Sequence, residues 1–159
     1  MPKLSPQMQR GAIAAWRVKE GGAFPQYTIL CEVSTTELVE PIFAIDAFAG
    51  RVRMLVEAQQ AGIVVRFLRQ PGQDDDANDL PVGTPLAVVV AEDDLDDAED
   101  DAARQEMLEA ARAWEVPTTD VLDDAQPRVP VLEWQSFLAE GGGGEGGAGG
   151  GGGGGGGCM

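Results

Sequence analysis

Few side chains in this 159-residue chain could act as nucleophiles, proton carriers or metal ligands. The chain contains no histidine, which excludes imidazole bases, histidine metal sites and Ser–His or Cys–His nucleophile pairs. Its two cysteines, Cys31 in an apolar run and Cys158 beyond a polyglycine tract, do not suggest a disulfide framework. Its two lysines are Lys3 and Lys19. The sequence therefore argues against a self-contained enzyme.

One run of carboxylates, Asp74, Asp75, Asp76 and Asp79, has ligands that suit Ca²⁺. The spacing of an EF-hand loop and its terminal glutamate are missing, however. We therefore interpret the run as an exposed loop and expect neither a metal nor a catalytic residue here.

Charge is distributed unevenly along the chain. Residues 1–91 carry 10 acidic and 8 basic side chains and residues 92–159 carry 17 and 3, so the net charge of −16 divides into −2 and −14. This predicts a folded domain followed by an acidic, solvated part. Nucleic-acid binding is not expected because Lys and Arg are not clustered. No apolar stretch approaches the roughly 20 residues of a bilayer span and no leader precedes the first strand, so neither membrane insertion nor a targeting peptide is expected.

Two copies of one pattern fill the first ninety residues. Segments 11–21 and 62–72 each place two glycines ten residues apart around a β-favouring run. Each leads through a loop to a second strand-like run, at 28–33 and 84–90. Short apolar runs bounded by Gly, Pro and Asp are typical of strands. The repeat predicts an all-β, quasi-twofold sandwich or flattened barrel.

The same segments resemble the lipoyl domain of dihydrolipoamide acyltransferases, the components of 2-oxoacid (pyruvate) dehydrogenase complexes. The first half of that domain is matched by MPKLSPQM (1–8), GAIAAW (11–16) and ILCEV (29–33), and the second half by MLVEA (54–58), GIVV (62–65) and LPVGTPLAVVV (80–90). The resemblance covers residues 1–91 and implies the flattened barrel, or hammerhead, of that family.

The resemblance also points to a missing residue. Family members carry Asp-Lys-Ala at the tip of a hairpin, and lipoic acid acylates the lysine. Counting forward from the first strand of the hairpin places Glu37 at that position. Counting back from the second strand places Arg51 there. A guanidinium stays protonated and is a poor nucleophile, and both lysines precede the hairpin. We therefore expect neither a lipoyl nor a biotinyl cofactor.

An apolar insertion, residues 41–50, lengthens this hairpin. Ile42, Phe43, Ile45 and Phe48 are more apolar than an exposed tip should be. The favoured interpretation is that they cover an edge or end of the sandwich as extra core. The alternative is a docking surface for a partner.

Three appendages are expected after residue 91. Residues 92–115 are expected to form an acidic linker and a helix over about 98–115. This helix lies against the sandwich, lies on a partner, or is only marginally stable. Residues 116–140 hold Trp134, Phe137 and Leu138 at helical spacing, either as an anchor docking in a groove or packed back on the domain. Residues 141–159, with 15 glycines, are expected to form a disordered tail.

The leading functional hypothesis is a non-catalytic, non-lipoylated structural or interaction subunit of a 2-oxoacid dehydrogenase complex or another mitochondrial assembly. It has protein partners and no small-molecule substrate, and it lies in the mitochondrial matrix, with a plastid as the alternative. The second hypothesis is a truncated dihydrolipoamide acetyltransferase component. A lipoyl carrier like that of glycine cleavage is nearly excluded by the missing lysine. The candidate contact residues are Ile42, Phe43, Ile45, Phe48, Trp114, Trp134 and Phe137.

Overall fold

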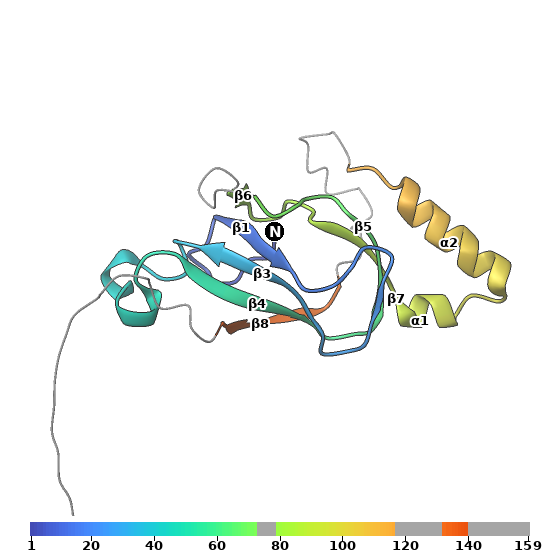
Figure 1. Cartoon of the computed structure of the whole chain (residues 1–159), viewed down its shortest axis with the longest axis horizontal. Helices are drawn as coiled ribbons and strands as arrows, with labels where there is room; N and C mark the ends of the chain where they lie inside the picture. The colour runs from blue at the N-terminus through green and yellow to red at the C-terminus, as the bar shows by residue number, and fades with distance from the viewer. Residues whose placement is uncertain (73–78, 117–131, 140–159) are drawn as a thin grey trace, which may run out of the picture.

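The structure, a computed structural model, describes residues 1–72, 79–116 and 132–139. Antiparallel strands form two sheets, and helices are few, which confirms the all-β class (Figure 1). The larger sheet has the strand order β6 (Leu80–Pro81), β1 (Arg10–Trp16), β3 (Ile29–Thr35), β4 (Val52–Ala58) and β8 (Trp134–Leu138). The smaller sheet has the order β2 (Ala23–Phe24), β5 (Gly62–Phe67) and β7 (Ala87–Ala91).

The two sequence copies share one register pattern. In the β1–β3 pair the register shifts between Ile13 and Ala15, and in the β5–β7 pair it shifts between Val64 and Arg66. Each shift follows the first glycine of its copy, Gly11 or Gly62, at the same distance. A bulge at equivalent positions bends both leading strands alike. The repeat seen in the sequence thus has a counterpart in the backbone.

The last aromatic residues of these two strands stack on one another. The ring centroids of Trp16 and Phe67 lie 4.3 Å apart with an interplanar angle of 22°. They occupy equivalent positions in the two copies, so the contact joins one copy to the other. Stacked aromatic pairs contribute beyond their buried area.

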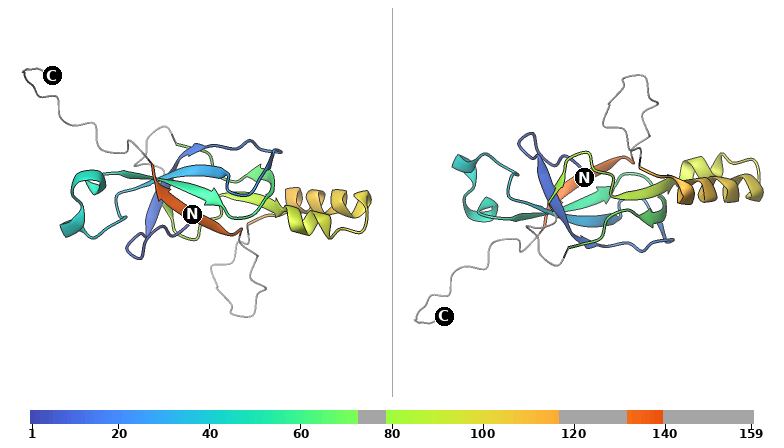
Figure 2. Two further views of the ribbon diagram at one scale, coloured as in Figure 1. Left: turned by 90° about the horizontal axis from the view of Figure 1, so that it is seen from below. Right: turned by 90° about the horizontal axis from the view of Figure 1, so that it is seen from above.

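Two helices follow β7 and lie at one end of the elongated molecule (Figure 2). α1 (Glu92–Asp96) begins directly after β7, and its Leu95 is fully buried. α2 (Asp101–Ala113) is capped by the carboxylate of Asp100, which accepts a hydrogen bond from the backbone of Ala103 at 2.8 Å. The predicted linker is therefore partly helical, and Leu95, the one large apolar side chain in that acidic run, anchors it.

The helix α2 lies against the sandwich. Its partly buried Met107, Leu108 and Ala111 pack on the buried cluster of Val65, Val90 and Leu95. The expected helix is present, and of the alternatives for it, packing on the sandwich is the one observed.

The segment around Trp134 packs back on the domain, one of its two expected alternatives, but it does so as a strand and not with the helical spacing that the sequence suggested. β8 pairs antiparallel with β4, from Met54 opposite Leu138 to Ala58 opposite Trp134. A five-residue segment with three apolar side chains is too short to fix its period, and the edge of β4 favours a strand because its backbone groups need partners. Strand β8 thus becomes the edge of the larger sheet.

Some expectations fall outside the described residues: the carboxylates Asp74 to Asp76 and the glycine-rich tail from residue 141 on. Within the described part of the chain, no helix is long and apolar enough to cross a membrane.

Candidate functional site

The hairpin between β3 and β4 is where the family resemblance places the chemistry. The two strands pair from Ile29 opposite Glu57 to Thr35 opposite Val52, and residues 36–51 join them. Two 3₁₀ turns, η1 (Pro41–Phe43) and η2 (Asp46–Phe48), shape this connection, and Gly50, with a φ of 73°, turns the chain back toward β4. Both turns lie at the end of the molecule opposite the helices (Figures 1 and 2).

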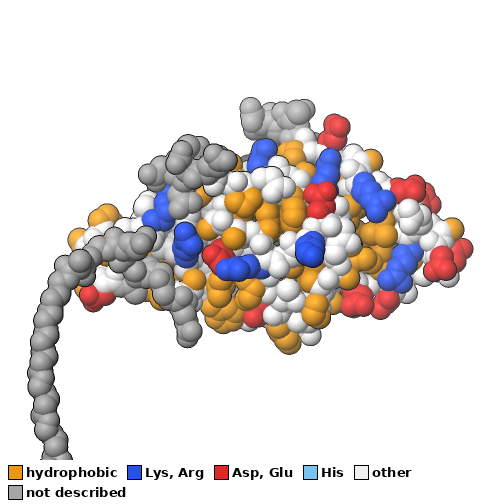
Figure 3. All heavy atoms as spheres, in the orientation of Figure 1, with side chains coloured by type: hydrophobic (Ala, Val, Ile, Leu, Met, Phe, Trp, Pro, Cys, Tyr) orange, Lys and Arg blue, Asp and Glu red, His pale blue; other side chains and the backbone are white. Residues whose placement is uncertain are grey.

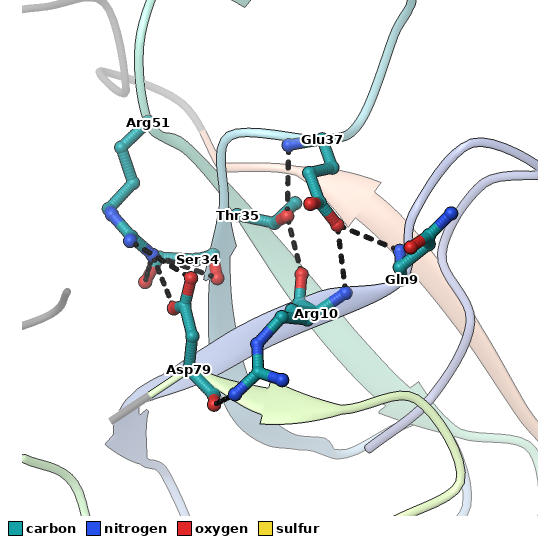
Figure 4. Close-up of polar contacts among 7 residues, drawn as sticks. All are labelled: Gln9, Arg10, Ser34, Thr35, Glu37, Arg51 and Asp79. Carbon is teal, nitrogen blue, oxygen red and sulfur yellow. Dashed lines mark hydrogen bonds and ion pairs between the residues drawn. The ribbon is translucent and has the colours of Figure 1, made fainter. Parts of the chain in front are cut away.

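Glu37, the first candidate for the attachment position, is bound to the neighbouring strand. One of its carboxylate oxygens accepts backbone hydrogen bonds from Gln9 and Arg10, both at 2.9 Å. Its own backbone N–H donates to the hydroxyl of Thr35 at 3.1 Å, and this buried hydroxyl donates to the carbonyl of Arg10 at 2.8 Å (Figure 4). The side chain therefore caps the start of β1 and does not project from the hairpin as a free arm.

Arg51, the second candidate, is also held in place. Its guanidinium forms an ion pair with Asp79, with Nη1 to Oδ1 at 3.1 Å and Nη2 to Oδ2 at 3.4 Å. Nη1 also donates to the carbonyl of the fully buried Ser34 at 3.4 Å (Figure 4). The pair joins the hairpin to the residue that precedes β6. Sequence reasoning missed this role of Asp79, because the sequence does not show that β6 lies beside β1.

Neither lysine lies on the hairpin tip. Lys19 follows β1, and β1 runs antiparallel to β3, so this lysine lies at the sheet end remote from Thr35. Lys3 lies in the segment before β1, next to Leu4, which packs against the cluster of Leu38, Val52 and Met54 at the base of the hairpin. The hairpin thus offers no amine for acylation.

The insertion presents its apolar side chains to solvent. The exposed fractions are 74% for Ile42, 60% for Phe43, 65% for Ile45 and 36% for Phe48. The favoured interpretation of these residues as extra core was therefore wrong. The physical reason is position, because the turns extend past the end of both sheets, where no second layer covers them. Figure 3 shows hydrophobic side chains at this end and acidic side chains gathered at the helical end.

The remaining candidate contact residues lie apart from this tip. Trp114 and Trp134 are half-buried, and Trp134 packs against the main core cluster. Phe137 is exposed on β8. None of the three belongs to the hairpin connection, and Phe137 lies opposite Leu55, three residues after the start of β4.

The chemically reactive side chain nearest the core is Cys31. Its thiol is buried, and burial raises its pKa to about 12. Such a thiol stays protonated at neutral pH and is a poor nucleophile. Among residues 1–72, 79–116 and 132–139, no group of three or more carboxylate or thiol side chains is arranged to hold a metal ion.

Comparison with known proteins found relatives among pyruvate dehydrogenase components. The chain is 38% identical over 94 residues to the pyruvate dehydrogenase complex protein X component, mitochondrial, of Chaetomium thermophilum, covering 59% of this chain and 17% of that protein. It is 32% identical over 92 residues to the dihydrolipoyllysine-residue acetyltransferase component of Neurospora crassa, covering 58% and 16%. It is 29% identical over 94 residues to the protein X component of Saccharomyces cerevisiae, covering 59% and 18%.

These matches cover less than a fifth of each relative's own length. No family model matches the chain. No solved structure matches it either.

Proposed function

We propose that this chain, whose first ninety residues form a lipoyl-type domain related to those of pyruvate dehydrogenase components, is a non-lipoylated interaction subunit of such a complex. The proposal includes the flattened barrel of that family for residues 1–91 and a contact surface on the rebuilt hairpin. We call this surface the hairpin tip and define it by Ile42, Phe43, Ile45 and Phe48. It includes no catalytic step and no bound cofactor.

One observation carries the proposal: exposed apolar side chains occupy the hairpin where the family carries its lysine. Contiguous exposed apolar side chains usually mark a contact with another protein. The two aligned positions, Glu37 and Arg51, are used in hydrogen bonds and an ion pair that hold the hairpin against β1 and Asp79. A hairpin held in this way presents the tip without first having to become ordered, which lowers the entropic cost of binding.

The tip is tested by affinity purification of the full chain from its native organism. We expect subunits of a pyruvate dehydrogenase complex to co-purify with the unchanged chain and to be lost with Phe43→Asp. The matched control is Tyr27→Asp, which removes another highly exposed aromatic ring, beside the opposite end of β3. Tyr27 has a φ of 66°, a region that aspartate tolerates, so this control should fold. Equal recovery with Phe43→Asp would show that the tip is not the contact, and recovery of unrelated proteins alone would refute the assignment to this complex.

Absence of lipoylation is tested separately by intact mass after co-expression with a lipoate ligase. We expect the unmodified mass, since the hairpin contains no lysine. A mass increase of one lipoyl group would overturn this part of the proposal.

A second candidate function is that the chain is a segment of an acetyltransferase component. The match to the Neurospora crassa acetyltransferase supports it. Intact mass of the native protein separates the two, because a longer native chain with a histidine-containing transferase domain would favour the second. The mitochondrial relatives support a location in the mitochondrial matrix, with a plastid as the alternative. A fluorescent fusion to the native reading frame tests the location.

A further inference from the structure

The three tryptophans of the chain are distant in sequence but line one pocket. The pocket has a volume of about 790 Å³ and receives Trp16 from β1, Trp114 from the end of α2 and Trp134 from β8. Leu30 and Val64 contribute from the two different sheets. Small-molecule sites in proteins are mostly apolar and measure about 300–1,000 Å³. The volume therefore falls in the range of a ligand site.

Part of this pocket is supplied by segments that follow the lipoyl-type domain. Ala111 and Trp114 line it from α2, and Leu132 and Trp134 line it from β8 and the residues before it. Contacts with the domain hold each of these segments in place. The carbonyl of Trp114 accepts a hydrogen bond from Arg66, α2 packs on the domain, and β8 pairs along β4. The appended segments thus complete the pocket as well as lengthening the chain.

The charges around the pocket indicate what it would accept. Among the described lining residues, Asp94 supplies a carboxylate and none supplies a lysine or arginine side chain. The Cys31 thiol stays neutral because burial raises its pKa to about 12. Among the lining side chains an anion would therefore meet a carboxylate and no lysine or arginine, in a site of low polarity, which is unfavourable.

We propose that this tryptophan pocket binds an uncharged, largely apolar small molecule, one with a long chain or fused rings that packs against the indoles. Indole rings offer a large apolar surface with a defined stacking geometry. The hairpin tip lies at the other end of the molecule from α2 (Figure 1). Ligand binding and tip docking are therefore independent, and either can fail without the other.

The test uses the full chain and the neutral fluorescent probe N-phenyl-1-naphthylamine. We expect saturable binding of one probe per chain, seen as a rise in probe emission and as energy transfer from the indoles. Trp134→Ala should weaken binding roughly tenfold or more. Phe137→Ala, on the same strand but outside the pocket lining, should leave it unchanged. Non-saturable binding, or equal loss with Phe137→Ala, would overturn the proposal.

Two further measurements guard against a misfolded variant and test the charge argument. Ala110→Phe adds bulk to the pocket lining at an exposed position and should also weaken binding roughly tenfold. Dodecanol should displace the probe at concentrations at least roughly tenfold lower than laurate, and Asp94→Asn should narrow that difference. Equal competition by laurate would refute an uncharged ligand.

Binding that appears only after residues 117–131 are replaced by a Gly-Ser linker would show that this segment of the chain is the occupant instead.

Discussion

The hydrogen bonds of Glu37 allow the sharpest stability prediction. The substitution Glu37→Ala removes a carboxylate oxygen that accepts two backbone N–H groups, from Gln9 and Arg10, both at 2.9 Å. A hydrogen bond to a charged group contributes about 1.5–3 kcal/mol. Gln9 and Arg10 are exposed, so water can replace the carboxylate on both N–H groups. We therefore expect each bond to contribute about 1 kcal/mol, below that range, and the two together about 2 kcal/mol.

Urea unfolding followed by tryptophan fluorescence measures this loss. Small domains have a urea m-value of about 1–3 kcal/mol per molar, so the midpoint should fall by about 1 M. Glu37→Gln keeps an acceptor oxygen but loses the charge, and we expect about half of the effect. Glu40→Ala is the matched control, because its exposed carboxylate accepts one side-chain hydrogen bond from Gln7, at 3.2 Å. It should change stability by less than about 0.5 kcal/mol.

The reasoning fails if Glu37→Ala and Glu40→Ala have the same midpoint as the unchanged chain. It also fails if Glu37→Gln is as destabilised as Glu37→Ala, because the neutral amide retains the acceptor geometry. The interpretation requires that the midpoint shifts while the m-value, the slope of the free energy of unfolding against urea concentration, stays the same. A changed m-value would mean that the unfolded state or the cooperativity had changed.

Three other predictions follow from burial and close approach. Gly62→Ala should cost more than Gly11→Ala, measured by urea midpoint, because a Cβ at 62 would lie 2.6 Å from the carbonyl oxygen of Val90, whereas at 11 it meets the movable end of Met8 at 2.5 Å. Leu38→Ala, in the buried base of the hairpin, should cost about 2–4 kcal/mol, whereas Phe43→Asp at the exposed tip should change stability by less than about 0.5 kcal/mol. In a Cys158→Ser background, Ellman's reagent should react with Cys31 only on unfolding, because burial raises the pKa of that thiol to about 12. The native state keeps this proton while the unfolded state loses it above about pH 9, so stability should fall between pH 9 and 12, and a flat profile over that window would contradict the burial.

The strands were predictable from the sequence because their signal is local. Gly11 and Gly62 mark equivalent positions, and the apolar runs that follow them have the composition of strands. The bulges after these glycines and the Trp16–Phe67 stack show that the sequence repeat reflects a repeated backbone path. The short helix α1 had a signal as well, in Leu95 within an acidic run, but one apolar residue does not fix a helix boundary.

The hairpin tip and β8 were not predictable, because their placement depends on distant partners. Apolar content usually indicates core, yet Ile42 and Ile45 lie past the end of the sheets, where no second layer is available to cover them. Trp134 and Phe137 follow β4 by many residues, and only the open edge of β4 made a strand the favourable conformation. The pocket that unites the three tryptophans depends on the long-range placement of β8 and of α2, so no window of sequence could reveal it.

The missing lysine is more than a point substitution in an intact carrier. A swinging arm needs an amine that is free to leave the surface, but the carboxylate of Glu37 accepts hydrogen bonds from β1, and Arg51 ties the hairpin to Asp79. A lysine at position 37 would place an ammonium against two N–H donors and remove the cap of β1, so it would be repelled from this site. A lysine at position 51 would keep the positive charge but lose the planar fork that holds both oxygens of Asp79. Either replacement would exchange a structural contact for an amine beside an apolar tip. These contacts support the proposal that the hairpin is not a carrier, and for this reason we look for its function in what the tip binds.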